Sequence, residues 1–189
     1  MEKQQLENIG LQFRELYNIG RRPRNASEWT RKIKHVLFKI GHQQKYSVYA
    51  GGIGNKVAWG EWLWDVVWAK QAKLDYKKTG EHPIKKLVLI CESEWLLDPS
   101  NIMRDFQKLT VGIAELKLYV YRIRKQTLNK KSKKNLLSDK LIDDCDKLII
   151  PNPEPMPSPY MFIGIPTESS DELSIEIRDN RGVRRKLQF

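Results

Sequence analysis

Two short stretches of the sequence place carboxylates inside runs of apolar residues. Asp65 lies in GEWLWDVVWAK (residues 60–70), and Glu92 and Glu94 come near the end of KKLVLICESEW (residues 85–95). Aspartate is depleted in strands and is rarely buried without a partner, so a purely structural role for Asp65 is hard to defend. A Glu-x-Glu pair at the end of a strand is more often a solvated rim, and for Glu92 and Glu94 that alternative stays open.

Acids that converge in a partly buried site predict a divalent cation. Ionised carboxylates repel one another there, and bringing them together costs several kcal/mol unless a positive charge compensates. The three histidines are scattered, which argues against zinc, whereas all-oxygen ligation suits Mg²⁺ or Mn²⁺. Such an ion polarises a phosphodiester, steadies the leaving oxygen and lowers the pKa of a bound water. The predicted metal ligands are Asp65, Glu92, Glu94 and Glu61, with a surface position as the alternative for Glu61.

Hydrophobic periodicity indicates the elements that must position these acids. The expected elements are helices over 5–18, over 27–41 with Ser27 as N-cap and Gly41 as stop, and from Asp98–Ser100 to Gly112, and strands at 46–50, 61–69, 86–95 and 116–123. The strands 61–69 and 86–95 are too close in sequence for a crossover helix, which predicts an antiparallel pair. Side chains two apart share a face of a strand, so Glu92 and Glu94 point the same way. The sequence does not fix the register that would bring Asp65 to Glu92.

A run of alternating prolines divides the chain. Residues 1–150 are expected to form a single α/β domain, and residues 151–189 a Pro-rich connector and a C-terminal β-hairpin that packs on the same domain. Pro151 to Pro159 recur at every second residue, which favours a stiff, extended connector. Strands are expected at 160–165 and 173–177, and DNRG (residues 179–182) suits a hairpin turn.

The net charge of +11 favours a polyanionic partner, nucleic acid above all, although basic surfaces also occur for solubility alone. Three basic segments are expected to hold phosphates, which gives an affinity that falls steeply with salt. Their candidate residues are Arg21, Arg22 and Arg24; Arg122, Arg124, Lys125, Lys130, Lys131, Lys133 and Lys134; and Arg184 and Arg185. The polar face of the helix 27–41, with Arg31, Lys32 and Lys34, is either solvated or phosphate-facing.

The sequence shows no apolar run of transmembrane length and no secretory signal at its start. Two cysteines make neither a disulfide framework nor a metal knuckle, and Cys91 is expected to be a packed hydrophobe. We therefore expect an intracellular, cytoplasmic protein with no membrane partner.

The order helix, three strands, helix, strand over residues 27–123 resembles the core of the PD-(D/E)XK nuclease superfamily, which has the restriction-endonuclease-like fold. In that superfamily an aspartate on the second strand and a (D/E)-x-K on the third bind Mg²⁺ and cut phosphodiester bonds. Asp65 matches the first position, Glu92 the second, and Glu94 occupies the lysine position. The resemblance implies a mixed central sheet flanked by helices, with a small C-terminal β extension, and a Mg²⁺-dependent endonuclease that prefers DNA to RNA and can form a homodimer.

Glu94 departs from the superfamily's pattern, although some type II restriction enzymes in it use Glu-x-Glu. Glutamate cannot supply the positive charge that lysine lends to the attacking water or the scissile phosphate. Lys108, on the helix after the third strand, is the candidate for a relocated lysine, with a solvated helix face as the alternative. The resemblance thus implies Asp65, Glu92, Glu94 and Lys108 as catalytic residues. Asp65→Asn is expected to leave the fold intact, because it removes a like charge.

Two other functions stay open. A nucleic-acid-binding protein could keep this fold without its chemistry, and it would bind with an affinity that Asp65 and Glu92 substitutions do not change. A protein-interaction module, whose tryptophans serve only as core and whose charge is incidental, would not be retained on DNA at moderate salt.

Overall fold

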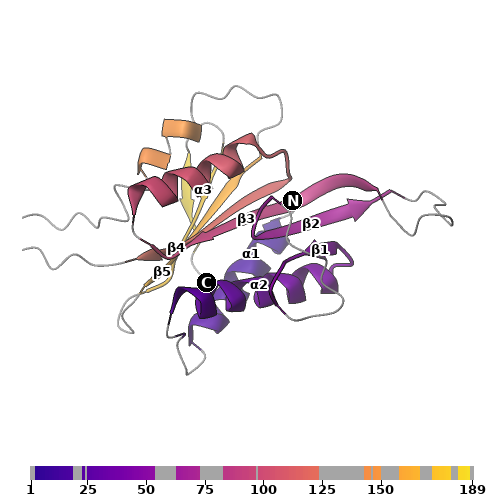
Figure 1. The fold of residues 1–189 in the computed structure, drawn as a ribbon, viewed down its shortest axis with the longest axis horizontal. Coiled ribbons are helices and arrows are strands. Elements are labelled where there is room, and N and C mark those ends of the chain that lie inside the picture. Colours follow the sequence, from indigo (N-terminus) through magenta and orange to yellow (C-terminus); the bar gives the residue numbers. More distant parts are fainter. Residues whose placement is uncertain are drawn as a thin grey trace, which may run out of the picture.

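The computed structural model describes residues 3–18, 23, 25–53, 63–72, 83–96, 98–123, 143–145, 147–149, 158–166, 172–179 and 183–187. In this part of the chain the labelled elements are α1 (Lys3–Asn18), α2 (Ala26–Gln43), β1 (Ser47–Tyr49), β2 (Val66–Gln71), β3 (Ile84–Glu94), α3 (Pro99–Val111), β4 (Leu116–Ile123), β5 (Tyr160–Pro166), β6 (Ser174–Arg178) and β7 (Arg184–Lys186) (Figure 1). The expected order of helix, helix, three strands, helix and strand is therefore confirmed. None of the described helices is long and apolar enough to cross a membrane.

The strands form one mixed sheet of seven, in the order β1-β2-β3-β4-β5-β6-β7. The pair β2–β3 is antiparallel, as expected, and so is β1–β2, whereas β3–β4 and β4–β5 are parallel. The chain returns from β3 to β4 through α3, which is the crossover that a parallel pair needs. The sheet closes with two more antiparallel pairs, β5–β6 and β6–β7.

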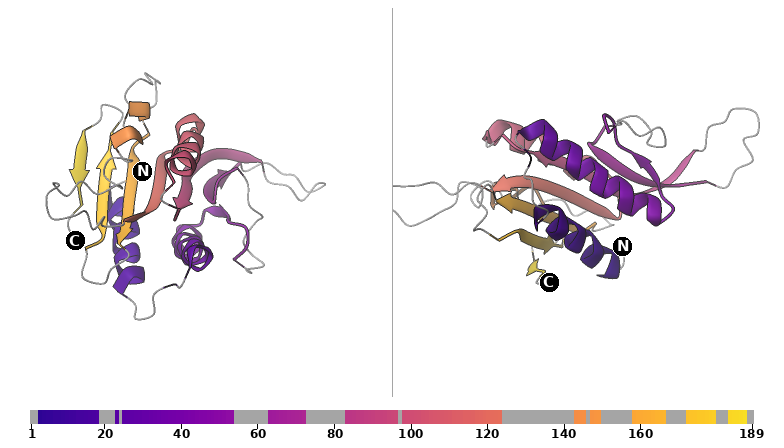
Figure 2. Two further views of the ribbon diagram at one scale, coloured as in Figure 1. Left: turned by 60° about the vertical axis from the view of Figure 1, so that its left-hand side comes forward. Right: turned by 90° about the horizontal axis from the view of Figure 1, so that it is seen from below.

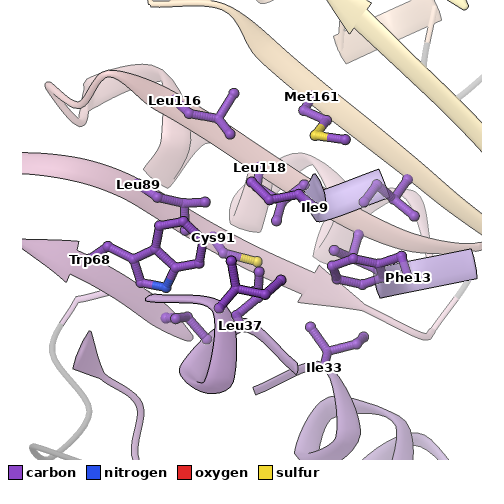
Figure 3. Close-up of a cluster of buried hydrophobic side chains, with 14 of the residues drawn as sticks. Ile9, Phe13, Ile33, Leu37, Trp68, Leu89, Cys91, Leu116, Leu118 and Met161 are labelled. Carbon is purple, nitrogen blue, oxygen red and sulfur yellow. The ribbon is translucent and has the colours of Figure 1, made fainter. Parts of the chain in front are cut away.

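Helices cover both faces of this sheet, so the molecule has three layers (Figures 1 and 2). On one face, Ile9 and Phe13 of α1 and Leu37 of α2 pack against the sheet in one buried cluster (Figure 3). On the other face, Phe106 of α3 belongs to a second cluster, together with Tyr119 of β4. Burying a Leu, Ile or Phe side chain contributes roughly 1.5–3 kcal/mol, so these two clusters hold the layers together.

Helix α2 begins and ends at residues other than those expected. Its N-cap is Asn25, not Ser27, because the Asn25 carboxamide accepts a hydrogen bond from the Glu28 N–H at 2.9 Å. The helix also continues past Gly41 to Gln43. A Cβ on Gly41 would lie 2.7 Å from side-chain atoms of Trp68, so this glycine permits close helix–sheet packing and does not end the helix.

Strand β2 is shorter at its start than the sequence predicted. Pairing with β3 begins at Val66, opposite Cys91, and residues 63–65 form a bend before the strand. Asp65 therefore precedes the strand and is not part of it. Helix α3 follows its prediction: the Asp98 carboxylate accepts a hydrogen bond from the Ser100 N–H at 2.8 Å, and Gly112 is the C-cap.

The C-terminal strands are not a small extension of the sheet. β5 lies inside the sheet between β4 and β6, and all seven of its residues are buried. β6 and β7 form the expected hairpin, and the three residues of β7, at the sheet edge, are exposed. The sequence misplaced this region because a buried parallel strand carries no signal of its partner. Cys91 and Cys145 are both free and buried, which confirms the packing role expected of Cys91.

Candidate active site

Asp65 lies where β2 and β3 bring their ends together. Its Oδ2 accepts hydrogen bonds from the Ser93 N–H at 2.9 Å and from the Ser93 hydroxyl at 2.7 Å. Its Oδ1 lies 3.4 Å from Lys34 Nζ. The bend at Asp65 is held in place by Trp64, whose indole N–H donates to the carbonyl of Lys108 at 3.0 Å. A carboxylate at this sheet end is thus fixed by α2 and β3, while its neighbour in sequence contacts α3.

Lys34 is buried, which excludes the solvated helix surface that was one of its two expected positions. Its side chain is 9% exposed, and its ammonium also donates to the Gly51 carbonyl at 3.4 Å. A buried ammonium needs charged or hydrogen-bonding partners, since desolvating it alone is costly. Asp65 is one of the partners that make the burial of Lys34 possible.

Glu92, at 3% exposed, is more deeply buried than the other predicted site acids that the structure describes, Asp65 and Glu94. Burial first, and then the negative charge of Asp65, raises the pKa of Glu92 from 4.5 to about 8, although Lys108 opposes this shift. Lys108 Nζ lies 3.4 Å from Glu92 Oε1, which is an ion pair with poor hydrogen-bond geometry. Within the described residues, Glu92 Oε1 has no hydrogen-bond partner.

Lys108 has a second and closer acid. Its ammonium lies 2.9 Å from Asp105 Oδ1, one helical turn earlier on α3. Burial lowers the pKa of Lys108, but Asp105 and Glu92 outweigh that effect and raise it. Lys108 therefore remains a cation, and the structure places it against Glu92 as the sequence analysis allowed.

The carboxylate of Glu94 is hydrogen-bonded to the backbone of the two residues that follow it. Its Oε1 accepts hydrogen bonds from the N–H groups of Trp95 and Leu96, both at 2.6 Å. Burial raises the pKa of Glu94, and these two donors oppose the rise. Asp105 of α3 also raises the pKa of Glu94, so this side chain interacts with the α3 side of the site.

A pocket opens beside Asp65 and Lys34, which we call the α2 pocket. Its volume is about 350 Å³, and it lies between the first half of α2, the turn at Gly51–Gly52 and the end of β3. Its polar lining comes from one stripe of α2 and from two residues of β3: Ser27, Thr30, Arg31 and Lys34, with Ser93 and Glu94. Trp29 of α2 stacks on Trp95 with ring centroids 4.9 Å apart, which fixes the end of β3 next to the helix.

The described acids suit a hard cation in part. Asp65 and Glu92 offer carboxylate oxygens, and Glu92 Oε1 is a buried acceptor without a hydrogen bond, whose ion-pair partner is the Lys108 ammonium at 3.4 Å. Mg²⁺ is commonly held by one or two carboxylates, with water and substrate phosphates completing its shell. Among the residues that the structure describes, no three His, Cys, Asp or Glu side chains are grouped to hold a metal. The fit therefore rests on two carboxylates, and Glu61 lies outside the described residues.

Few of the residues expected to hold phosphates can be located. Arg122 is half-buried at the end of β4, Arg185 is exposed, and the exposed Arg184 donates to Asp143. The remaining candidates lie outside the described residues: Arg21, Arg22, Arg24, Arg124, Lys125, Lys130, Lys131, Lys133 and Lys134.

Sequence reasoning did not identify three residues of this site. Asp105 could have been found, since it lies three residues before Lys108 on a predicted helix, a spacing that favours an ion pair. Ser93, between the two glutamates, gave no signal of its own. Lys34 was assigned to the polar face, and only its spacing from the apolar Leu37 and Ile33 indicates a position at the edge of the buried face.

Comparison with known proteins adds no assignment. A scan against protein-family models finds no matching family, and searches of curated proteins and of solved structures find no matching protein.

Proposed function

We propose that the protein is a Mg²⁺- or Mn²⁺-dependent nuclease of the restriction-endonuclease-like class, which hydrolyses phosphodiester bonds, preferably in DNA. The observation that carries the proposal is the Asp65–Glu92 pair. Asp65 immediately precedes Val66, which pairs with Cys91 of β3, and its negative charge helps to raise the pKa of Glu92. Asp65 contacts Lys34 of α2 and Glu92 contacts Lys108 of α3, and Glu92 Oε1 has no hydrogen bond among the described residues. The element order of α2, β1, β2, β3, α3 and β4 is also the order that the resemblance implies.

Each side chain has a role that its surroundings favour. Asp65 and Glu92 would hold the cation, which when bound polarises the phosphodiester and stabilises the leaving oxygen. Lys34 orients Asp65 through the 3.4 Å contact and presents its ammonium to the α2 pocket. Lys108 orients Glu92 in the same way, through the 3.4 Å contact on the α3 side. These two lysines supply the positive charge that Glu94, in the usual lysine position, cannot.

The α2 pocket is the proposed seat of the substrate phosphate. Arg31, Ser27 and Thr30 offer donors to phosphate oxygens, and the pocket adjoins Lys34 and Ser93, the two partners of Asp65. A phosphate seated there would lie beside Lys34 and Ser93, which both contact Asp65. Cutting both strands of a duplex requires two such sites, so the proposal includes a homodimer during double-strand cleavage.

A cleavage assay tests this function. Supercoiled plasmid, linear duplex, single-stranded DNA and RNA are incubated with Mg²⁺, Mn²⁺ or EDTA. We expect metal-dependent cleavage, reduced at least 100-fold in Asp65→Asn and Glu92→Gln, since removing an essential group commonly costs that much. Glu7→Gln, an exposed acid on α1, is the matched control and should cleave like the wild type. Equal cleavage by wild type and both site variants, or none by any protein in any metal, contradicts the proposal.

A second function is favoured by one observation. Asp65 and Glu92 each have a lysine within 3.4 Å, so their charges are already compensated without a cation. The alternative is therefore a nucleic-acid-binding protein of the same fold without chemistry. Titration calorimetry distinguishes the two: the nuclease binds Mg²⁺ and loses that binding in Glu92→Gln. The binding protein takes up no Mg²⁺ and binds DNA equally well in both forms.

A further inference from the structure

A second basic surface lies at the opposite end of the β2–β3 pair from Asp65 and Glu92. A pocket of about 750 Å³ opens there, and we call it the lysine pocket. Three elements contribute one lysine each, with uncharged side chains between them: Lys45 after α2, Lys70 on β2 and Lys85 on β3, with Ser47 and Gln71. No acidic residue lines it among the residues that the structure describes.

The three lysines are exposed, and their charges are not compensated by the described residues. None of the three has an ion pair in that part of the chain, and Lys70 contacts only a ring, that of Tyr46, at 5.8 Å. Neighbouring lysines behave differently. Lys86, next to Lys85 in sequence, lies 2.8 Å from Glu115. Uncompensated charges of one sign around a concave surface focus the local potential and attract anions.

The backbone at Lys45 fixes this residue in the turn that ends α2. Lys45 has φ of 61°, and no other described non-glycine residue has a positive φ. It follows the C-cap Gln44 of α2, a position usually occupied by glycine or asparagine because other residues are strained there. The positive φ closes a Schellman-type turn, in which the Tyr46 N–H donates to the Gly41 carbonyl at 3.0 Å. Here it accompanies a lysine at the pocket lining.

We propose that the lysine pocket binds the phosphodiester backbone of a nucleic acid without reading its bases. Lysine ammonium groups are point charges that suit phosphate oxygens, and the Ser47 hydroxyl and Gln71 amide add donors. No aromatic ring on which a base could stack is among the lining residues described. Lys70 lies five positions after Asp65 along β2, which corresponds to roughly 17 Å. A duplex that reaches both would span about five base pairs, at 3.4 Å per pair.

Binding measured in EDTA tests this surface without any contribution from catalysis. The probe is a fluorescein-labelled 20-base-pair duplex of random sequence, titrated by anisotropy between 0.05 and 0.3 M NaCl, and each phosphate contact contributes about −0.9 to the slope of log affinity against log salt. We expect Lys45→Ala/Lys70→Ala/Lys85→Ala to reduce the slope by about 2.7 and to weaken binding about 100-fold at 0.15 M salt. A second duplex of different sequence should give the same losses.

Matched variants separate the pocket from net charge. Lys3→Ala/Lys86→Ala/Lys147→Ala removes the same three charges, but each of these lysines has an acidic partner. This control should weaken duplex binding no more than about threefold. The single substitution Lys85→Ala should weaken duplex binding more than Lys86→Ala does. Circular dichroism checks that each variant is folded.

Three outcomes overturn the proposal. One is a pocket variant that binds the duplex within twofold of wild type at an unchanged salt slope. Another is an equal loss in the control, which reduces the effect to net charge. The third is a pocket variant that still binds the duplex but no longer binds phosphatidylserine vesicles or a poly-glutamate peptide as the wild type does. That result assigns the pocket to a different partner. Because the assay needs no divalent ion, failure of the nuclease proposal leaves this result unaffected, and the reverse also holds.

Discussion

Lys34 Nζ lies 3.4 Å from Asp65 Oδ1, with 9% of the lysine side chain and 18% of the aspartate side chain exposed. The pair links the middle of α2 to the bend before β2, so it connects a helix layer to the sheet at the candidate site. Breaking a buried pair leaves the remaining charge poorly solvated, which is more costly than loss of a surface pair. Stability and chemistry are therefore expected to depend on the same contact.

Lys34→Met should lower the free energy of unfolding by about 1–3 kcal/mol, because Asp65 loses its cation while remaining largely buried. Urea denaturation at pH 7 measures the change. Lys39→Met, an exposed position on the same helix, should fall within about 0.5 kcal/mol of wild type. A Lys34 variant as stable as the Lys39 control would mean that the ion pair contributes nothing.

Asp65→Asn is now expected to destabilise the protein, contrary to the expectation from like charges alone. The substitution relieves Glu92 of a neighbouring negative charge, but it also removes a charged partner of Lys34. The double variant with Lys34→Met should lose less than the sum of the two single losses, with a coupling of about 0.5–3 kcal/mol. Strict additivity in the double-mutant cycle would show that the two side chains act independently.

The stability of the protein should depend on pH through Glu92. The folded-state pKa is about 8 and the ordinary value 4.5, so the folded protein holds a proton that the unfolded chain releases. That stabilisation is complete below pH 4.5 and is lost as the pH rises to about 8. Glu92→Gln imitates the protonated form at every pH. Its free energy of unfolding should therefore exceed that of the wild type by an amount that grows with pH, by up to about 1.4 kcal/mol per pH unit, and reaches roughly 2–5 kcal/mol. Denaturation in EDTA at pH 5.5, 7 and 8.5 measures this difference in free energy of unfolding. A difference that stays constant across this range would contradict the prediction.

Added Mg²⁺ should raise the melting temperature more at pH 8.5 than at pH 6, because a carboxylic acid must lose its proton to bind a cation. A free Mg²⁺ concentration one hundred times the dissociation constant stabilises by about 2.7 kcal/mol, or roughly 5–10 °C for a chain of this size. Differential scanning fluorimetry with NaCl of matched ionic strength detects the difference. The shift should vanish in Glu92→Gln, and a shift that survives there would place the ion elsewhere.

Arg31→Ala tests the α2 pocket. Arg31 is exposed and lines the pocket, and it has no ion pair among the residues described. Its removal should weaken duplex binding about fivefold at 0.15 M salt and reduce the salt slope by about 0.9. Stability should change by less than about 0.5 kcal/mol. Lys39→Ala on α2 removes the same charge outside the pocket, and an equal loss there would deny the pocket any role.

The sequence was sufficient for features that depend on local patterns and insufficient for those set by distant contacts. The start of α3, with Asp98 as one of two candidate caps, the stop at Gly112 and the antiparallel pair β2–β3 follow from short-range signals, and all three are present. The prediction that α2 ends at Gly41 was wrong because this glycine instead permits close packing against Trp68, which is 27 positions away in sequence. The position of β5 between β4 and β6 depends on parallel pairing across a long connection, which no local pattern encodes.

The same limit applied to the site. Asp65 and Glu92 were noticeable because acids among tryptophans and in buried strands are unusual, whereas Lys108 was named only through the resemblance. Their partners were not, since the contact of Lys34 with Asp65 joins residues from two layers. The aliphatic part of a lysine side chain can cover apolar surface while its ammonium contacts an acid. The position of a lysine at the edge of a helix face therefore does not determine whether it is buried.

The outermost strand, β7, consists of Arg184, Arg185 and Lys186, and all three are exposed. A second copy that added its own β7 to this edge would bring three cations against three, and sheet growth from molecule to molecule is opposed by that repulsion. Fibre-like association through this edge is therefore suppressed at ordinary salt. Any pairing of subunits needed for double-strand cleavage has to form through a different part of the surface.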